Sequence, residues 1–320
     1  RTEDTAANVR AHPLYDEYWA SKESDLAAIV VPAYVVASWS DHGLHTRGTL
    51  EAYRALASPQ KWLEVHGRKK WQHYYQAQSV SKQLQFFDHF LKDAPATLHS
   101  WPPVLIEVRE AANIGALRAE SGWPLARTVY RRLFLDARHG VLCDALPTIA
   151  TQLSYDPCEP AARAVFDYRF GSDTELTGPM KLRLWVEAQG ADDMDLFVAI
   201  EKLDPSGTRV PFVFYAMNEN GPAALGWLRV SHRALDPARS RPEQPVHSHL
   251  AELLLTNGER VPVDIEIWAS ATLFRAGEFV RLVVQGRDIP EPGVPNAPFA
   301  RHDKTRNAGR HILHTGGPYE

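Results

Sequence analysis

Apolar residues in the first hundred positions follow the pattern of a parallel α/β sheet. The run Ile29–Ala37 is continuously apolar and rich in β-branched residues, which predicts a strand buried on both faces. The segment Thr49–Leu56 carries apolar residues at helical spacing, and Lys61–Val65 has the composition of a second short strand. Two strands with a helix between them predict part of a doubly wound sheet.

The clearest helical pattern lies in the segment Ser79–Lys92, which ends before Ala94-Pro95. We expect its apolar stripe to cover the sheet. The stripe consists of Val80, Leu84, Phe87 and Leu91. Upstream, the aromatic segment His12–Trp19 predicts a short helix over the site, and the basic, aromatic segment Arg68–Tyr75 predicts a loop.

From about Trp101 the pattern changes to short strands separated by turns, with glycines at 207, 258 and 277 supplying turn positions. Many strands without helices between them imply an antiparallel β-sandwich, with the jelly roll as the expected version. The proline-rich stretch 290–298 is expected to be a surface loop. The predicted strands are Pro102–Arg109, Tyr130–Leu135, Val165–Phe170, Lys181–Glu187, Leu196–Leu203, Leu225–Ser231, Val261–Trp268 and Phe279–Gln285.

Composition narrows the class of protein. The chain has 320 residues, of which 44% are hydrophobic, so it can bury a large core, and its length favours two domains. A net charge of −4 gives no basic surface for nucleic acid, and no apolar run reaches the roughly 18 residues of a membrane span. The first residues carry no signal-peptide core, and Cys143 and Cys158 are expected to be a reduced pair, which favours the cytoplasm.

An acid and a histidine stand at the ends of the first two predicted strands. Asp41 follows the first strand and His66 the second, so both are expected at the carboxyl edge of one sheet. An acid followed by a histidine is the later part of the Ser…Asp…His order of α/β-hydrolases. No glycine in the chain is followed two residues later by serine, and Ser38 and Ser40 only flank the acid. Either the nucleophile lies upstream of Arg1, or the protein is not a triad enzyme.

Two other groups of polar residues could suggest metal sites, but a simpler structural interpretation is favoured for each. The acidic run Asp192–Asp195 lacks further ligands at the spacing of a calcium loop, which favours an acidic turn. His247 and His249 would be half of a zinc site without a third ligand, which favours a solvated loop. We therefore expect no metal and no cofactor.

The order and spacing of several motifs over nearly the whole chain resemble the cocaine-esterase and X-Pro dipeptidyl-peptidase family of serine hydrolases. The motifs are Val31-Pro32-Ala33, Ser38-Trp39-Ser40-Asp41, Arg47-Gly48-Thr49, Lys61-Trp62-Leu63, His66-Gly67, Phe86-Phe87-Asp88-His89-Phe90-Leu91-Lys92, Glu120 with Trp123-Pro124, Thr177-Gly178-Pro179, Asp193-Met194-Asp195-Leu196-Phe197, Leu228-Arg229-Val230-Ser231-His232-Arg233 and His314-Thr315-Gly316-Gly317.

The resemblance implies an α/β-hydrolase domain, a helical cap and a C-terminal jelly roll, of which this chain resembles the C-terminal portion. Residues 1–28 would end the cap region, 29–100 would be the C-terminal part of the α/β-hydrolase domain, and 101–320 the jelly roll. The serine elbow would lie in a missing N-terminal portion, so that the chain alone is expected to be inactive and poorly soluble. The family includes peptidases, esterases and β-lactam acylases, so the resemblance does not identify the substrate.

The resemblance implies Asp41 as the catalytic acid. His66 is our preferred base and His73 the alternative, because relatives place the histidine a few residues past the strand, where this chain has Arg68, Lys69 and Lys70. Aromatic and histidine side chains near these residues are pocket candidates, with core packing as the competing interpretation. These are Trp39, His42, Trp71 and Tyr74, with His45 and Tyr75 as further possibilities.

The expected activity is hydrolysis of a small-molecule ester or amide through an acyl-enzyme. No nucleic acid or membrane partner is expected, and homo-oligomerisation stays open. The alternative is a non-catalytic β-sandwich module attached to an incomplete hydrolase remnant, with carbohydrate as the candidate ligand.

Overall fold

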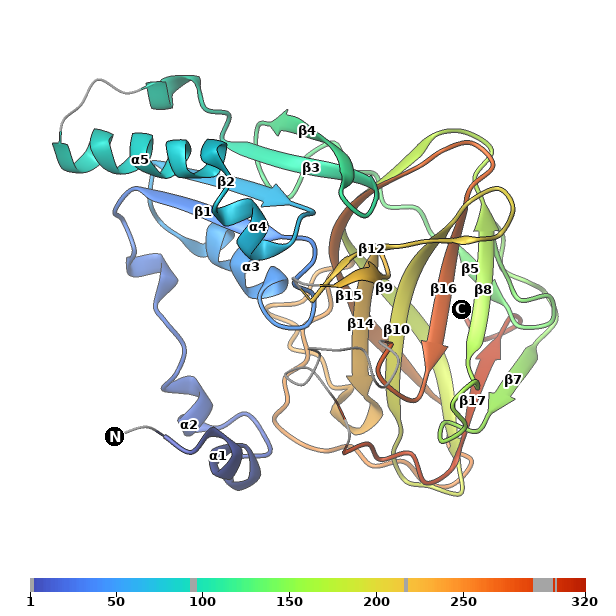
Figure 1. Cartoon of the computed structure of the whole chain (residues 1–320). Coiled ribbons are helices and arrows are strands. Elements are labelled where there is room, and N and C mark those ends of the chain that lie inside the picture. The colour runs from blue at the N-terminus through green and yellow to red at the C-terminus, as the bar shows by residue number, and fades with distance from the viewer. Residues whose placement is uncertain (1–2, 93–96, 216–217, 290–301, 303) are drawn as a thin grey trace.

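The computed structural model describes residues 3–92, 97–215, 218–289, 302 and 304–320. Figure 1 shows two parts: a small α/β part at the upper left and a larger part of β-strands at the right, with helices α1 and α2 below the α/β part. Among the described residues, strands far outweigh helices, so the predicted combination of an α/β segment with a β-rich C-terminal part is confirmed. The predicted loop at 290–298 lies outside the described residues.

The α/β part is a short parallel sheet with a helix on each face. Strands β1, β2 and β3 are neighbours in that order and run parallel, with Leu63 of β2 opposite Val104 of β3. Helix α3 packs on one face, and Phe86 of α5 contacts Tyr34 and Trp62 on the other. The elements are β1 (Ala33–Ser38), α3 (Thr46–Ala55), β2 (Lys61–His66), α4 (Lys70–Tyr74), α5 (Ala77–Lys92), η2 (Thr97–Ser100), β3 (Val104–Ala111) and β4 (Ile114–Glu120).

The prediction of a first strand buried on both faces was wrong. The strand begins only at Ala33, and Val30 and Val31 before it are 62% and 63% exposed, while Val36 within it is 42% exposed. The physical reason is that β1 is an edge strand, which pairs with β2 alone among the described strands. The apolar run therefore predicts the strand correctly but overestimates how much of the strand is buried.

The face of α5 was also predicted wrongly. The helix exists, but its stripe points outward, with Leu84 56% and Leu91 74% exposed. The buried residues are instead Ser79 and Phe86. Aromatic contacts of Phe86 with Tyr34 and Trp62 hold this face of the helix against the sheet.

Upstream and downstream of these elements, two short segments differ from the prediction. The aromatic segment 12–19 is mostly irregular, and the helices there are α1 (Thr5–Ala11), α2 (Glu17–Ala20) and the 3₁₀ turn η1 (Leu26–Ala28). Asp4 and Asp16 cap α1 and α2 with their carboxylates, which explains where these helices begin. The segment after His66, predicted to be a loop, contains helix α4.

The β-rich part consists of two layers that meet at β15. One layer has the order β14-β10-β16-β8-β6-β5, and the other the order β15-β9-β17-β7. Apart from the single β6–β8 pair, the pairs within these layers are antiparallel. The elements are β5 (Phe134–Asp136), β6 (Val141–Cys143), β7 (Thr151–Tyr155), β8 (Ala164–Arg169), β9 (Thr174–Gln189), β10 (Asp195–Leu203), β11 (Arg209–Val210), β12 (Phe212–Phe214), β13 (Asn218–Gly221), β14 (Ala224–Arg229), η3 (Val230–His232), β15 (Val261–Phe274), β16 (Phe279–Gln285) and β17 (Arg310–Thr315).

A crossing at β15 joins the layers to each other and to the α/β part. Gly226 of β14 lies opposite Ile267, and a Cβ at Gly226 would lie 2.3 Å from the Glu266 carbonyl oxygen, so only glycine fits this approach. Thr272 of β15 pairs with Arg109 of β3. One continuous sheet therefore runs from the α/β part into the sandwich.

The main core lies between the two layers. Leu182, Leu184 and Val186 of β9 alternate inward within the predicted strand Lys181–Glu187, and meet Val198 of β10 and Phe166 of β8. The glycines at 207, 258 and 277 all have the positive φ that their predicted turns require. No helix among the described residues has the length and apolarity needed to cross a bilayer.

Candidate functional site

Asp41 and His66 lie at the same edge of the sheet, at the carboxyl ends of β1 and β2. Ser38, the last residue of β1, is the parallel partner of His66, and the Trp39 amide donates to the His66 carbonyl oxygen at 2.8 Å. The chain then turns sharply, because the Asp41 carbonyl oxygen accepts from the amides of residues 44 to 46. This turn leads into α3 and leaves the Asp41 side chain nearly buried.

The carboxylate of Asp41 is paired with a lysine. Its Oδ2 lies 2.5 Å from Nζ of Lys70, the first residue of α4. Within the described chain, no hydrogen bond joins this carboxylate to His66 or His73. The predicted assignment of His66 as base thus stays a prediction: the fold brings acid and histidine to one edge without a direct contact.

The two histidines form a separate group with Glu64. The rings of His66 and His73 stack at 3.7 Å, and His73 Nε2 lies 3.3 Å from Glu64 Oε1. The Arg68 amide donates to His66 Nδ1, so the ring proton of His66 is on Nε2. Burial, reinforced by His73, lowers the pKa of His66 to about 3, so its imidazole is neutral at physiological pH.

Glu64 is the acid of this second group. Burial alone would raise its pKa, but hydrogen bonds from His73, Lys82 and Tyr34 lower it to about 2. Tyr34 Oη donates to Glu64 Oε2 at 2.6 Å, and Lys82 of α5 reaches the same oxygen. The carboxylate is therefore ionised, and it anchors both α4 and α5 to β2.

His42 is a fully enclosed neutral histidine beside the acid. The Leu225 amide donates to its Nδ1 at 3.2 Å, and burial together with the charge of Arg109 lowers its pKa to about 3. Its ring centroid lies 6.0 Å from that of Trp268 on β15. His42 thus connects the acid loop to the sandwich, while His45 precedes the first residue of α3.

The aromatic pocket candidates separate into one core residue and an exposed group. Trp39 is buried against Trp123, and its Nε1 donates to the Glu107 carbonyl oxygen at 2.8 Å. Trp71, Tyr74 and Tyr75 contact one another at the surface of α4. Trp39 therefore fits the competing interpretation of core packing, and the α4 aromatics are free to meet another surface.

Ser38 and Ser40 are both enclosed next to the acid. Their hydroxyl oxygens lie 2.7 Å apart, and both reach the Arg68 carbonyl oxygen. These contacts hold both hydroxyls against the segment that follows β2.

The sequence did not indicate a large cavity that Arg47 of α3 lines together with the sandwich. It has a volume of about 1140 Å³ and opens between residues 9–23, the segment 232–250 and the sandwich. One wall is aromatic: Trp227 lies 5.0 Å from Trp268 and 5.7 Å from His302, between ring centroids. In the sequence, the only sign of this wall is one tryptophan on each of two predicted strands, Trp227 and Trp268. The pairing of β14 with β15 brings the two rings together.

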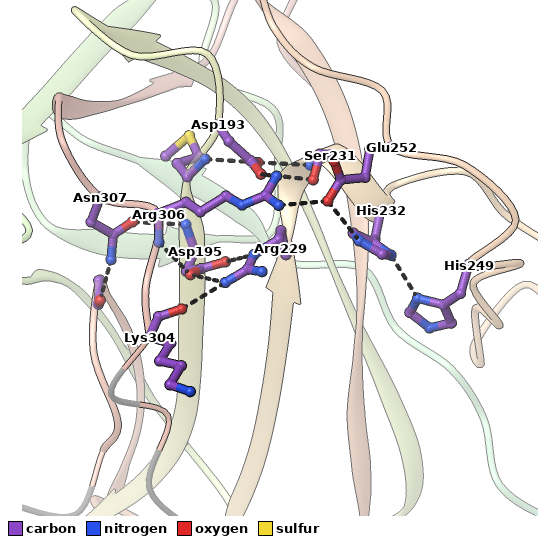
Figure 2. A network of polar contacts seen from close by, with 12 residues as sticks. Asp193, Asp195, Arg229, Ser231, His232, His249, Glu252, Lys304, Arg306 and Asn307 are labelled. Atoms are coloured by element: carbon purple, nitrogen blue, oxygen red, sulfur yellow. Dashed lines mark hydrogen bonds and ion pairs between the residues drawn. The ribbon is translucent and has the colours of Figure 1, made fainter. Parts of the chain in front are cut away.

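Asp193 and Asp195 of the acidic run have protein partners, as Figure 2 shows. Asp193 accepts from the Ser231 amide and hydroxyl and from Arg306, while Asp195 accepts two bonds from Arg229. His232 and His249 face each other through their Nδ1 atoms at 3.0 Å. No group of three or more His, Cys, Asp or Glu among the described residues is arranged to hold a metal ion.

Comparisons with known proteins agree with this architecture. The family profile described as the X-Pro dipeptidyl-peptidase C-terminal non-catalytic domain matches residues 98–320. A CocE/NonD family hydrolase from Staphylococcus aureus is 41% identical, with a TM-score of 0.96 over 99% of this chain and 58% of that one. The comparison with curated proteins gave no match.

Two more distant structures share the fold. An aminopeptidase from a marine sediment Thaumarchaeota archaeon is 17% identical with a TM-score of 0.69, over 97% of this chain and 57% of that one. An alpha-amino acid ester hydrolase is 16% identical with a TM-score of 0.69, over 98% and 58%. The chain thus spans less than two thirds of the length of these structures.

Proposed function

The chain belongs to the cocaine-esterase (CocE/NonD) and X-Pro dipeptidyl-peptidase family of hydrolases, and on this premise we propose that it is part of an enzyme that cleaves ester or amide bonds through an acyl-enzyme. Because it spans 58% of its S. aureus relative, the activity is proposed for a whole protein of the relative's length. The matched profile describes a non-catalytic domain, so the residues proposed for catalysis precede position 98.

The observation that carries this proposal is the placement of Asp41. Its carboxylate is buried at the carboxyl edge of β1, with Lys70 in contact and His66 at the neighbouring strand end. A hydroxyl nucleophile needs a base to remove its proton, and that base needs an oriented acid. We assign Asp41 the role of acid, with the base drawn from the groups at the end of β2.

The finer architecture is part of the same proposal. We assign residues 1–28 to the end of a cap region, 29–100 to the α/β-hydrolase domain and 101–320 to a jelly roll, supported by the two antiparallel layers. The nucleophile would come from an N-terminal portion of the same protein, and the substrate would be a small ester or amide. Cys143 and Cys158 are unpaired, which supports the proposed cytoplasmic location.

Fluorophosphonate labelling of the whole protein tests the proposed function. A serine hydrolase should be labelled on one serine, and Asp41→Asn should slow labelling by about a hundredfold or more, because the base loses its orienting acid. The matched control Asp192→Asn changes an exposed aspartate and should label at the wild-type rate. A folded wild-type protein that takes no label would refute the proposal.

A second candidate, a non-catalytic binding module, is favoured by the aromatic wall of the cavity. Trp227 and Trp268 present adjacent rings of the kind that stack on sugar or aromatic ligands. Titration of tryptophan fluorescence with oligosaccharides would reveal such binding, and Trp227→Ala should abolish it. Binding in a protein that takes no fluorophosphonate label would favour this candidate over the hydrolase.

A further inference from the structure

The carboxylate of Asp41 at the edge of the sheet forms an ion pair with a basic side chain. In a catalytic triad the base is the group in direct contact with the acid. Among the described residues, the only basic side chain with a contact to the Asp41 carboxylate is Lys70, whose Nζ lies 2.5 Å from Oδ2. Both predicted histidines lie on β2 or α4 nearby, yet neither contacts this carboxylate.

The histidines are engaged by a different acid. His73 faces Glu64, and His66 stacks on His73 while its Nδ1 accepts from the Arg68 amide. A base held by an acid in a triad donates its Nδ1 proton to that acid, which His66 cannot do while Nδ1 is an acceptor. For His66 to contact Asp41, it would have to give up both the Arg68 bond and the stack on His73.

The position of Lys70 suits a group that exchanges a proton with something outside these residues. Its side chain is 35% exposed, whereas the Asp41 side chain is 10% exposed, so the carboxylate lies inward and the amine lies at the rim. The amine is therefore the more accessible of the two groups to a hydroxyl from outside these residues. Lys70 also begins α4, and His73 on the same short helix is held by Glu64, so the helix is fixed at both groups.

We propose that Lys70 takes the place of histidine and accepts the proton of the nucleophilic hydroxyl, an inference that rests on the proposed function. Nζ, an ammonium in its ion pair with Asp41, first gives one proton to solvent. The neutral amine then removes the serine proton as the serine oxygen bonds to the substrate carbonyl carbon, and the carbonyl electron pair moves onto oxygen. Collapse of this intermediate breaks the bond to the leaving group, which takes the proton from Nζ. Water then repeats the sequence on the acyl-enzyme and restores both serine and amine.

A lysine base has a pH dependence that a histidine base lacks. Free lysine amines titrate near 10.4 and free imidazoles near 6.5. If an amine is the base, the rate should keep rising above pH 8, because the neutral fraction keeps increasing. If His66 is the base, the rate should be flat between pH 6 and 10, because its pKa in the folded protein is about 3. An imidazole with the free value would instead level off above about pH 7.

The test measures the rate of fluorophosphonate labelling of the whole protein between pH 6 and 10 for four variants. Lys70→Arg keeps a cation beside Asp41 but cannot give up a proton, and it should slow labelling by at least about a hundredfold. His66→Gln and His73→Gln test the competing bases, because a histidine base predicts the hundredfold loss in one of these variants rather than in Lys70→Arg. The matched control Lys69→Arg alters a neighbouring lysine that pairs with Glu219, and should behave as wild type.

The outcomes separate this inference from the function on which it rests. Rapid labelling of Lys70→Arg, or a wild-type profile that is flat above pH 7, would overturn the role of Lys70 while leaving a serine hydrolase in place. Absence of label in the wild-type protein would overturn the proposed function itself. Loss of label in Lys70→Arg, with an unchanged melting temperature and a wild-type rate that rises above pH 8, would support the inference.

Discussion

The α/β part and the sandwich differ in how completely they cover their own apolar residues. In the sandwich, Phe166, Val198 and Ile265 are fully enclosed between two layers. In the α/β part, the stripe of α5 and the valines before β1 face outward, although each lies on a regular element or beside one. Large contiguous apolar surface on a soluble protein marks an interaction site. The sandwich is therefore closed by its own strands, whereas the α/β part presents surface suited to further protein.

The largest expected loss of stability comes from a cavity in the core of the sandwich. Phe166→Ala removes a ring with no exposed surface from the centre of the sandwich and should cost about 3–5 kcal/mol of unfolding free energy. The matched change in the open part, Leu91→Ala, should cost no more than about 0.5 kcal/mol, because Leu91 is largely in water already. Urea unfolding of both variants measures the difference, and equal costs would contradict the comparison.

A smaller effect is expected from the polar network that ties the end of the chain to the sandwich (Figure 2). Asp193→Ala removes the acceptor for the Ser231 amide and hydroxyl and for Arg306, and should cost about 2–4 kcal/mol. The neighbouring Asp192 is exposed, so Asp192→Ala should be nearly neutral. A thermal unfolding scan that gives both variants the same midpoint would show that this network adds no stability.

Sequence reasoning succeeded where a residue's own neighbours along the chain determine its environment. Phe279–Gln285 and Leu196–Leu203 were predicted as strands and form β16 and β10, because their apolar residues and the turns that bound them are local signals. It failed for β4, whose glycine and alanines have little strand preference: most of Ile114–Glu120 is exposed, and the pairing with β3 makes it a strand.

In the site, too, features set by neighbours along the chain were predictable and features set by distant residues were not. The carboxyl ends of two parallel strands were expected to meet, and Asp41 and His66 do share that edge. The partner of Asp41 was not predictable, because Lys70 reaches it only through the turn into α4, and that segment was expected to be a loop. The burial of His42 likewise depends on Leu225, 183 positions away.

Acid should weaken the α/β part through its neutral histidines. The folded pKa values of His42 and His66 are about 3, below the ordinary value near 6.5, because burial disfavours the imidazolium. Between these pH values the unfolded chain binds protons that the folded chain does not, so stability is complete above about pH 6.5 and falls as pH decreases. The melting temperature should drop from pH 7 to pH 5, and less so in His42→Gln. Parallel curves for the two proteins would refute this role of His42.

The smallest effect on stability, and the most specific one for the comparison, is expected at the outer face of α5. Leu84→Lys with Phe87→Lys replaces side chains that are mostly in water, so the unfolding free energy should change by no more than about 0.5 kcal/mol. Association of the chain with itself should nevertheless fall, because the two charges interrupt the apolar stripe. Gln72→Lys with Gln78→Lys adds the same charge at exposed polar positions and serves as the control. Sedimentation velocity distinguishes the two pairs: if net charge alone governs association, both reduce it equally, whereas an apolar interaction face predicts that only the α5 stripe pair does.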